Sequence, residues 1–315
     1  MPFTLSHAAA VLPGIHRNGT ARGGLVAAAL VAGSFAPDLT YFADTVLPGA
    51  MRFGNFTHSP AGVLSVDALS TAALLAGWLL LREPLVALLP RARQGRAYAL
   101  LRGRPWRGRR PVPLAAAFYL SAVLGSTTHI VWDAFTHSGR WGARLLPVLG
   151  ESVAGFPVTM YVQYGSSAIA LALIVAFTAS ALRRLPDASP PARVPVLTAR
   201  GRLLAAGLLA VCVLLGAAHR CLRFGAGPGA DATLFDFVPT ALFGAGAGLA
   251  LGLPLYAAAA RIRHRARPTP PAERNAVGGN AAGRNAVEPG PAEQNPNQQP
   301  PQDNRAEQPE TSVSG

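Results

Sequence analysis

Six stretches of about twenty mostly apolar residues run through this chain, and they limit the fold more than any other feature. Each is long enough to cross the roughly 30 Å hydrocarbon core of a bilayer as a helix. Half of the 315 residues are hydrophobic and only 14% are charged, a composition typical of helical membrane proteins. We therefore expect an all-α, polytopic membrane protein with about six transmembrane helices, at residues 24–43, 61–82, 113–132, 162–182, 203–222 and 236–260.

Positive charge gathers in alternate connections between these stretches. The chain has 28 basic residues, all of them arginine, and nine lie between Arg82 and Arg110. Further groups occupy 183–202 and 261–267. All three segments fall on one side if the spans alternate, and the positive-inside rule makes that side, with the C-terminus, cytoplasmic. Because the arginines are not interleaved with aromatic residues on one face, we do not expect nucleic-acid binding.

The N-terminal segment Thr4–Ile15 is apolar but too short to span a bilayer. It lacks the features of a signal peptide. Two arrangements remain open. The segment can lie flat on the cytoplasmic surface, or it can form a short helix antiparallel to residues 24–38 with its turn at 18–24. In the second arrangement His7 comes close to Asp38, and other helices must bury both limbs.

The composition changes at the C-terminal end of the chain. Residues 266–315 are rich in Pro, Asn, Gln, Gly and Glu, so they cannot bury a core and we expect a disordered tail. The helical transmembrane domain is then 1–265, with the candidate site in 1–140.

The third predicted span ends in a polar stripe. His129, Asp133 and His137 recur every four residues, and each step of four turns only about 40° around a helix. All three therefore share one face, and ionisable groups at this depth usually serve a function. His129 and His137 are about 12 Å apart along a continuous helix, so His129 and Asp133 form the better pair of ligands for one ion. His137 can bind a second ion, act as a proton donor, or hydrogen-bond a ligand.

Other ionisable residues fall on the same side of the predicted membrane. Asp38 follows Pro37, which can break the first span, and His58 directly precedes the second span. With His7, these residues complete a mixed set of imidazole and carboxylate groups. Such a set favours a divalent transition metal over calcium. We predict a metal site made of His7, Asp38, His58, His129 and Asp133, with zinc as the first candidate.

The order of these motifs resembles that of an uncharacterised family of bacterial integral membrane proteins. More distantly it is similar to an inner-membrane family of metal-dependent hydrolases. The likeness covers about residues 1–140 and rests on Met1-Pro2-Phe3-Thr4-Leu5-Ser6-His7, Ala36-Pro37-Asp38, Thr57-His58-Ser59 and His129-x-x-x-Asp133. Where the hydrolases have His-Arg-Gly, this chain has Phe53-Gly54-Asn55. The resemblance implies a protein of the bacterial cytoplasmic membrane.

Three functions fit these residues. The first is metal-dependent hydrolysis of a lipid-linked or phosphoester substrate, with Asp133 and His137 as catalytic residues. The second is a non-enzymatic protein with a structural metal or a polar network, and the third is a transporter. Residues His219, Arg220 and Arg223 can receive an anionic group, although a location at the membrane interface explains them better. Asp67 lies about 180° around the helix from His58 and is expected to contact something else.

Overall fold

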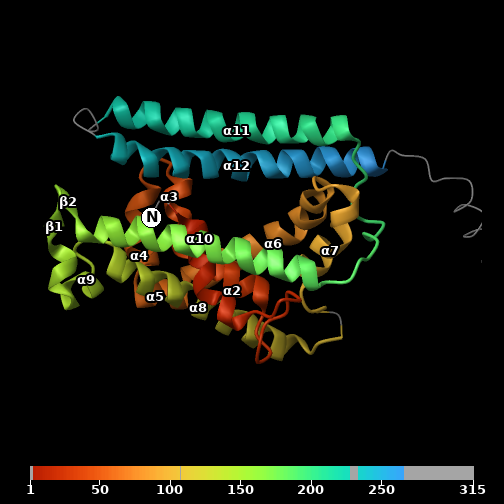
Figure 1. Cartoon of the computed structure of the whole chain (residues 1–315), viewed down its shortest axis with the longest axis horizontal. Coiled ribbons are helices and arrows are strands. Elements are labelled where there is room, and N and C mark those ends of the chain that lie inside the picture. The colour runs from red at the N-terminus through yellow and green to blue at the C-terminus, as the bar shows by residue number, and fades with distance from the viewer. Residues whose placement is uncertain (1–2, 107, 228–232, 266–315) are drawn as a thin grey trace, which may run out of the picture. The chain divides into compact units, whose positions relative to one another are not determined.

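The computed structural model describes residues 3–106, 108–227 and 233–265. Within these residues the chain is almost entirely helical, which confirms the predicted all-α fold (Figure 1). Five helices are long and apolar enough to cross a membrane: α6 (Val66–Ala87), α8 (Pro111–Thr136), α10 (Val158–Arg184), α11 (Ala199–Gly225) and α12 (Leu234–Arg265). The predicted disordered tail, 266–315, lies outside the described residues.

The expected span at 24–43 is not a continuous helix, so the prediction of six spans was one too many for the described residues. This segment forms three short helices: α2 (Ala27–Gly33), η3 (Ala36–Asp38) and α3 (Leu39–Ala43). Pro37 lies in the first turn of η3, where it has no backbone N–H to donate to the preceding turn. The break places Asp38 at the junction between η3 and α3.

The N-terminal segment is a buried hairpin arm, the second of the two arrangements considered. It consists of η1 (Thr4–His7), α1 (Ala8–Val11) and η2 (Leu12–Gly14). An isolated bridge between Ile15 and Ala21 closes the turn. Val11, Ile15 and Leu30 then pack together against Phe177 of α10. Neighbouring helices therefore bury both arms, which is the condition for non-spanning backbone at membrane depth.

Three short helices precede α6 and position His58. They are η4 (Ala50–Phe53), α4 (Gly54–Thr57) and α5 (Pro60–Leu64). His58 is the C-terminal cap of α4. Ser59 then caps α5 by accepting a hydrogen bond from the Gly62 backbone, and Pro60 occupies the first turn, as the sequence indicates. Because α4 ends directly before His58 and α5 begins at Pro60, the backbone conformation at His58 is fixed, and with it the direction of the side chain.

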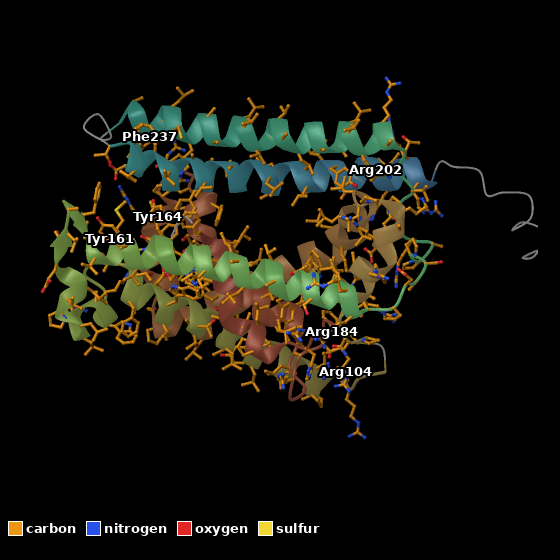
Figure 2. All side chains as sticks on the ribbon, in the orientation of Figure 1. Arg104, Tyr161, Tyr164, Arg184, Arg202 and Phe237 are labelled. Carbon is orange, nitrogen blue, oxygen red and sulfur yellow. The ribbon has the colours of Figure 1, made fainter. Side chains whose placement is uncertain are left out.

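The arginine-rich connections lie together at one end of the helices. The first contains α7 (Arg91–Arg102). Glu83 lies 3.9 Å from Arg193 and 3.7 Å from Arg261, and Arg96 forms a 2.6 Å ion pair with Asp187. Figure 2 shows Arg104 of the first segment and Arg184 and Arg202 of the second at this end. The basic segments that were predicted to share one side of the membrane therefore lie at the same end of the helices.

The opposite end carries the connection between α8 and α10. It holds α9 (Trp141–Leu145), η5 (Pro147–Gly150) and the antiparallel pair β1 (Ser152–Val153) and β2 (Phe156–Pro157). The candidate site lies at this end of α8, because His129 and Asp133 belong to the last two turns of that helix.

The last two long helices form an antiparallel hairpin (Figure 1). They approach closely through glycines: a Cβ on Gly216 would lie 2.2 Å from the Gly244 carbonyl oxygen, and one on Gly248 would lie 2.0 Å from that of Cys212. Small residues commonly permit such close contact in membranes. The outer face of α11 exposes leucines, including Leu203 at 74%, as expected for contact with lipid.

Candidate metal centre

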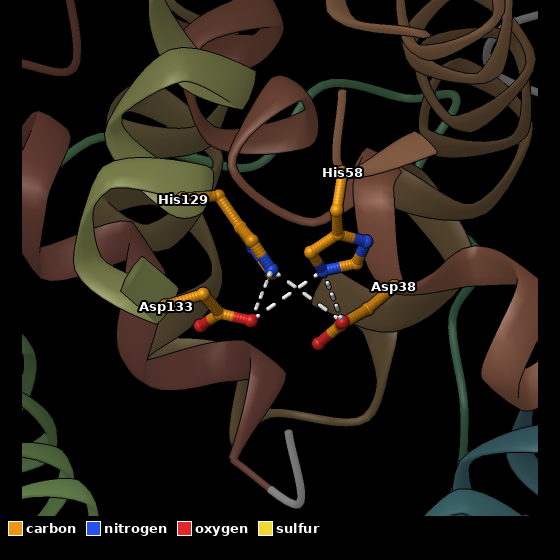
Figure 3. Close-up of side chains that lie close together, drawn as sticks. All are labelled: Asp38, His58, His129 and Asp133. Carbon is orange, nitrogen blue, oxygen red and sulfur yellow. Dashed lines mark ion pairs between the residues drawn. The ribbon is translucent and has the colours of Figure 1, made fainter. Parts of the chain in front are cut away.

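Four side chains from three separate segments meet at one point (Figure 3). Asp38 comes from the end of η3, His58 from the cap of α4, and His129 and Asp133 from the last turns of α8. One possible ligand atom from each residue lies within 4.8 Å of the other three. The structure therefore brings together four of the five predicted metal ligands.

The distances within this cluster fit a cation better than direct hydrogen bonds. His58 Nε2 is 3.5 Å from Asp38 Oδ1 and 3.4 Å from Asp133 Oδ2. His129 Nε2 is 3.4 Å and 3.6 Å from the same two oxygens. Two ligands bound to zinc at about 2.0–2.2 Å with a tetrahedral angle are roughly 3.3–3.6 Å apart. These four separations thus match four of the six edges of a tetrahedral ligand set.

Three of the facing atoms have no hydrogen-bond partner. These are Asp38 Oδ1, His58 Nε2 and His129 Nε2, and all are buried. An unsatisfied buried polar atom costs free energy, so several that point at one position indicate a missing partner. A bound cation would satisfy all of them at once.

Backbone carbonyls orient both imidazole rings. His129 Nδ1 lies 2.7 Å from the Ser34 carbonyl oxygen, and His58 Nδ1 lies 2.9 Å from that of Gly54. A carbonyl only accepts hydrogen bonds, so each Nδ1 must carry the proton and donate it. In the neutral ring, Nε2 then has a free lone pair directed at the centre of the cluster. Metal-binding histidines typically have this second interaction.

Asp38 is held in the ionised form. Thr4 Oγ1 donates a hydrogen bond to Asp38 Oδ2, which leaves Oδ1 for the cluster. Burial tends to raise the pKa of Asp38, but the electrostatic influence of neighbouring His129 outweighs it and holds the pKa well below its usual range. The carboxylate is therefore ready to bind a cation at neutral pH.

His7 lies beside this set of four. Its ring stacks on His129 with the centroids 3.8 Å apart, and its Nε2 is 3.5 Å from Asp133 Oδ1. Thus His7 faces the carboxylate oxygen that points away from the other three ligands. Burial, together with the electrostatic influence of His129, lowers the pKa of His7 to about 3, so the ring is neutral. The predicted role of His7 as a direct ligand stays a prediction.

His137 is a neighbour of the cluster, as the sequence indicates. It caps the C-terminus of α8, and its Nδ1 is 3.9 Å from Asp133 Oδ2. Its side chain is 28% exposed, and burial lowers its pKa below the ordinary value. His137 also lines an open cavity of about 270 Å³ between the end of α8 and the starts of α10 and α12. It can reach both the cluster and a molecule in that cavity.

Tyr41 and Arg140 adjoin the cluster, although sequence reasoning did not identify them. The ring centroids of Tyr41 and His58 are 5.6 Å apart, and the Arg140 side chain lies close enough to Tyr41 to act on its pKa. Burial raises the pKa of Tyr41 to about 12, so its hydroxyl stays protonated. Neither residue shows a motif or spacing that would have revealed it. Thr4, in contrast, belongs to the opening motif and lies three residues before His7.

The arginines at the end of α11 contact the end of α3. Arg220 is buried, and its Nη1 donates hydrogen bonds of 2.7 Å to the Tyr41 carbonyl and to Thr45 Oγ1. Arg223 donates to the carbonyls of Asp44 and Thr45. These contacts satisfy carbonyls at the end of α3, as arginines often do at helix C-termini. Both side chains therefore attach α11 to α3.

Asp67 is a further acidic residue in the first half of the chain. It is fully buried near the start of α6, and neither of its carboxylate oxygens has a hydrogen-bond partner among the described residues. It lies outside the set of four. The expected 180° separation from His58 assumes one continuous helix, whereas His58 caps α4 and Asp67 belongs to α6.

One protein-family model matches residues 1–258, and its description is "Domain of unknown function (DUF4184)". No curated protein matches the chain. No solved structure matches it either.

Proposed function

The chain belongs to this family of unknown function, and we propose that it is a membrane-embedded hydrolase that uses a divalent transition metal to cleave a lipid-linked or other amphiphilic phosphoester. The observation that carries this proposal is the convergence of two oriented imidazoles and two carboxylates in a buried cluster. Two nitrogen and two oxygen ligands suit zinc, with manganese and iron as the other candidates.

Asp38, His58, His129 and Asp133 would hold the ion. A metal of this kind supplies a bound water of lowered pKa and polarises the bond to be cleaved. Asp38 contributes a fixed negative charge, because Thr4 occupies its other oxygen. The two histidines contribute neutral donors whose tautomers are set by Ser34 and Gly54.

Proton transfer falls to Asp133 and His137. Asp133 Oδ1 has no hydrogen-bond partner and faces the neutral ring of His7, so this carboxylate can accept a proton without releasing the ion from Oδ2. His137 lies beside Asp133 at the wall of the cavity. From there it can pass the proton taken up by Asp133 on to the leaving group.

A site on membrane-type helices favours a substrate that resides in the bilayer, so membrane lipid is the proposed partner. The positive-inside rule places the arginine-rich end and the C-terminus in the cytoplasm and the metal centre at the outer face of the cytoplasmic membrane. Single cysteines at Ser138 and at Arg104 test this arrangement. We expect a membrane-impermeant thiol reagent to label the first in intact cells and the second only after permeabilisation. The reverse pattern would contradict the proposed orientation.

The test of catalysis uses full-length protein purified in detergent and loaded with zinc or manganese. Release of phosphate or headgroup is measured on a panel of phospholipids and lipid-linked phosphates. We expect His137→Ala to retain the metal and to lower kcat by about 10²–10⁴-fold, the usual contribution of a general acid or base. His16→Ala is the matched control, because His16 is exposed and lies outside the cluster.

A structural metal site is the competing function, and one observation favours it. Asp38 and His129 are completely buried, and the cluster joins η3, α4 and α8. In that case removal of the metal lowers the melting temperature, but no lipid in the panel is turned over by metal-loaded protein.

If metal-loaded protein does turn over a lipid, the Asp133→Asn variant tests the role of Asp133. Equal turnover by wild type and Asp133→Asn would remove Asp133 from the mechanism.

A further inference from the structure

The metal cluster is open to its surroundings on one side only. The side chains of Asp38 and His129 have no exposed surface, and that of His58 is 1% exposed. Asp133 is the most exposed of the four at 5%. A substrate must therefore approach past Asp133, where the half-buried side chains of His137 and Arg140 lie.

The Tyr41 side chain is held firmly next to this opening. Its ring contacts His58 and Phe243, with centroids 5.6 and 5.5 Å away. On another side it meets Gly54, where a Cβ would come within 2.8 Å of the Tyr41 hydroxyl oxygen. The Tyr41 backbone carbonyl is fixed by the hydrogen bond from Arg220. The hydroxyl group therefore occupies one defined position beside the cluster.

Arg140 brings a positive charge to the same position. It is the N-terminal cap of α9, and its backbone N–H donates to the carbonyl of His137, the residue that caps α8. Its guanidinium lies close enough to the side chain of Tyr41 to lower the pKa of the hydroxyl. Among the described residues no carboxylate forms an ion pair with it. A guanidinium has five N–H donors, so most of them are available to a ligand.

We propose that the Arg140 guanidinium and the Tyr41 hydroxyl bind the anionic oxygens of the substrate beside the metal, so the substrate class is a phosphate ester. This inference rests on the proposed function. A planar guanidinium matches the spacing of two phosphoryl oxygens. A neutral ester or amide would leave this charge without a partner. The phosphate can belong to a lipid headgroup or to a soluble molecule, since both present the same oxygens.

Phosphate binding tests the proposal without requiring turnover. Zinc-loaded full-length protein in detergent is titrated with inorganic phosphate and, in a second arm, with a short-chain phosphatidic acid, and binding is measured calorimetrically. We expect Arg140→Gln to weaken both by about 10–100-fold, the usual value of a charge-assisted hydrogen bond. Tyr41→Phe should weaken both by a smaller factor. Tighter binding of the lipid than of free phosphate identifies the lipid as the source of the anion.

Arg144→Gln is the matched control, because Arg144 is an exposed residue one turn further along α9 and its substitution removes the same charge. It should change phosphate affinity by less than about two-fold. The proposal is overturned if Arg140→Gln binds phosphate as wild type does, or if Arg144→Gln weakens binding equally. Metal content is measured for every variant. If Arg140→Gln loses phosphate binding but retains the metal, this inference is supported even if no lipid is hydrolysed. The experiment therefore distinguishes failure of this inference from failure of the proposed hydrolase function.

Discussion

The contact between α2 and α8 sets the spacing of the metal ligands, and Gly125→Ala should disturb it. A Cβ on Gly125 would lie 2.4 Å from the Leu30 carbonyl oxygen and 2.8 Å from the Ser34 backbone nitrogen. Ordinary van der Waals contact begins at about 3.4 Å. The two helices must therefore separate by about 1 Å at this point. Ser34 is also the residue whose carbonyl orients His129 at 2.7 Å.

A separation of that size lengthens the hydrogen bond between Ser34 and His129 to roughly 3.7 Å, which is beyond hydrogen-bonding range. It also moves Asp38, which follows α2, away from His129. Loss of a supporting hydrogen bond of this kind typically lowers metal affinity by about 10–100-fold. We expect a loss in this range for Gly125→Ala, measured by competition with a chromophoric zinc chelator.

Gly77→Ala is the control for this experiment. Gly77 lies within α6, and a Cβ there meets nothing within 4 Å. It should keep the affinity of wild type. Size-exclusion chromatography and circular dichroism establish that both variants are folded. If folded Gly125→Ala binds zinc as tightly as Gly77→Ala, the packing of α2 on α8 does not determine the ligand geometry, and the reasoning fails.

Three further changes test the cluster. Replacing both His129 and Asp133 by alanine should abolish stoichiometric metal in purified protein, which is measured as zinc content. It should also remove the roughly 2.7 kcal/mol of stabilisation expected when the metal is at 100 times its Kd, which is measured by thermal melts. If the double variant retains metal, the metal site lies elsewhere. Thr4→Val should lower zinc affinity by about 10-fold, because Asp38 loses its supporting hydrogen bond. Asp67→Asn should leave metal content unchanged and raise the free energy of unfolding by about 1 kcal/mol, because a buried carboxylate without a partner is replaced by a neutral amide. A lower melting temperature for this variant would show that Asp67 has a stabilising partner.

Local spacing predicted the part of the site that belongs to one helix. His129 and Asp133 are four residues apart, so any regular helix places them on one face, and the structure does so within α8. The cap at Ser59 and the position of Pro60 in the first turn of α5 depend equally on neighbouring residues. Such features depend only on neighbouring residues, which is why the sequence reveals them.

Features that depend on packing were harder to predict. Residues 24–43 are apolar enough for a span, yet Pro37 divides the segment, and the break is stable because α4, α6 and α8 pack against η3. The hydropathy of the segment contains no information about that cover. Tyr41 and Arg140 are nearly 100 residues apart in the chain, and only the fold brings their side chains together.

Asp133 connects the binding of the ion to its use. Its Oδ2 faces both metal-binding histidines, its Oδ1 faces His7, and His137 lies on its exposed side. Without a cation, two ionised carboxylates and several unpartnered imidazole nitrogens would remain buried together, an arrangement that costs much free energy in a membrane-type interior. With a cation, the same groups join the N-terminal hairpin, α4 and α8. The ion that would activate water is therefore also the partner that makes this part of the fold stable, so metal loading should precede and permit catalysis.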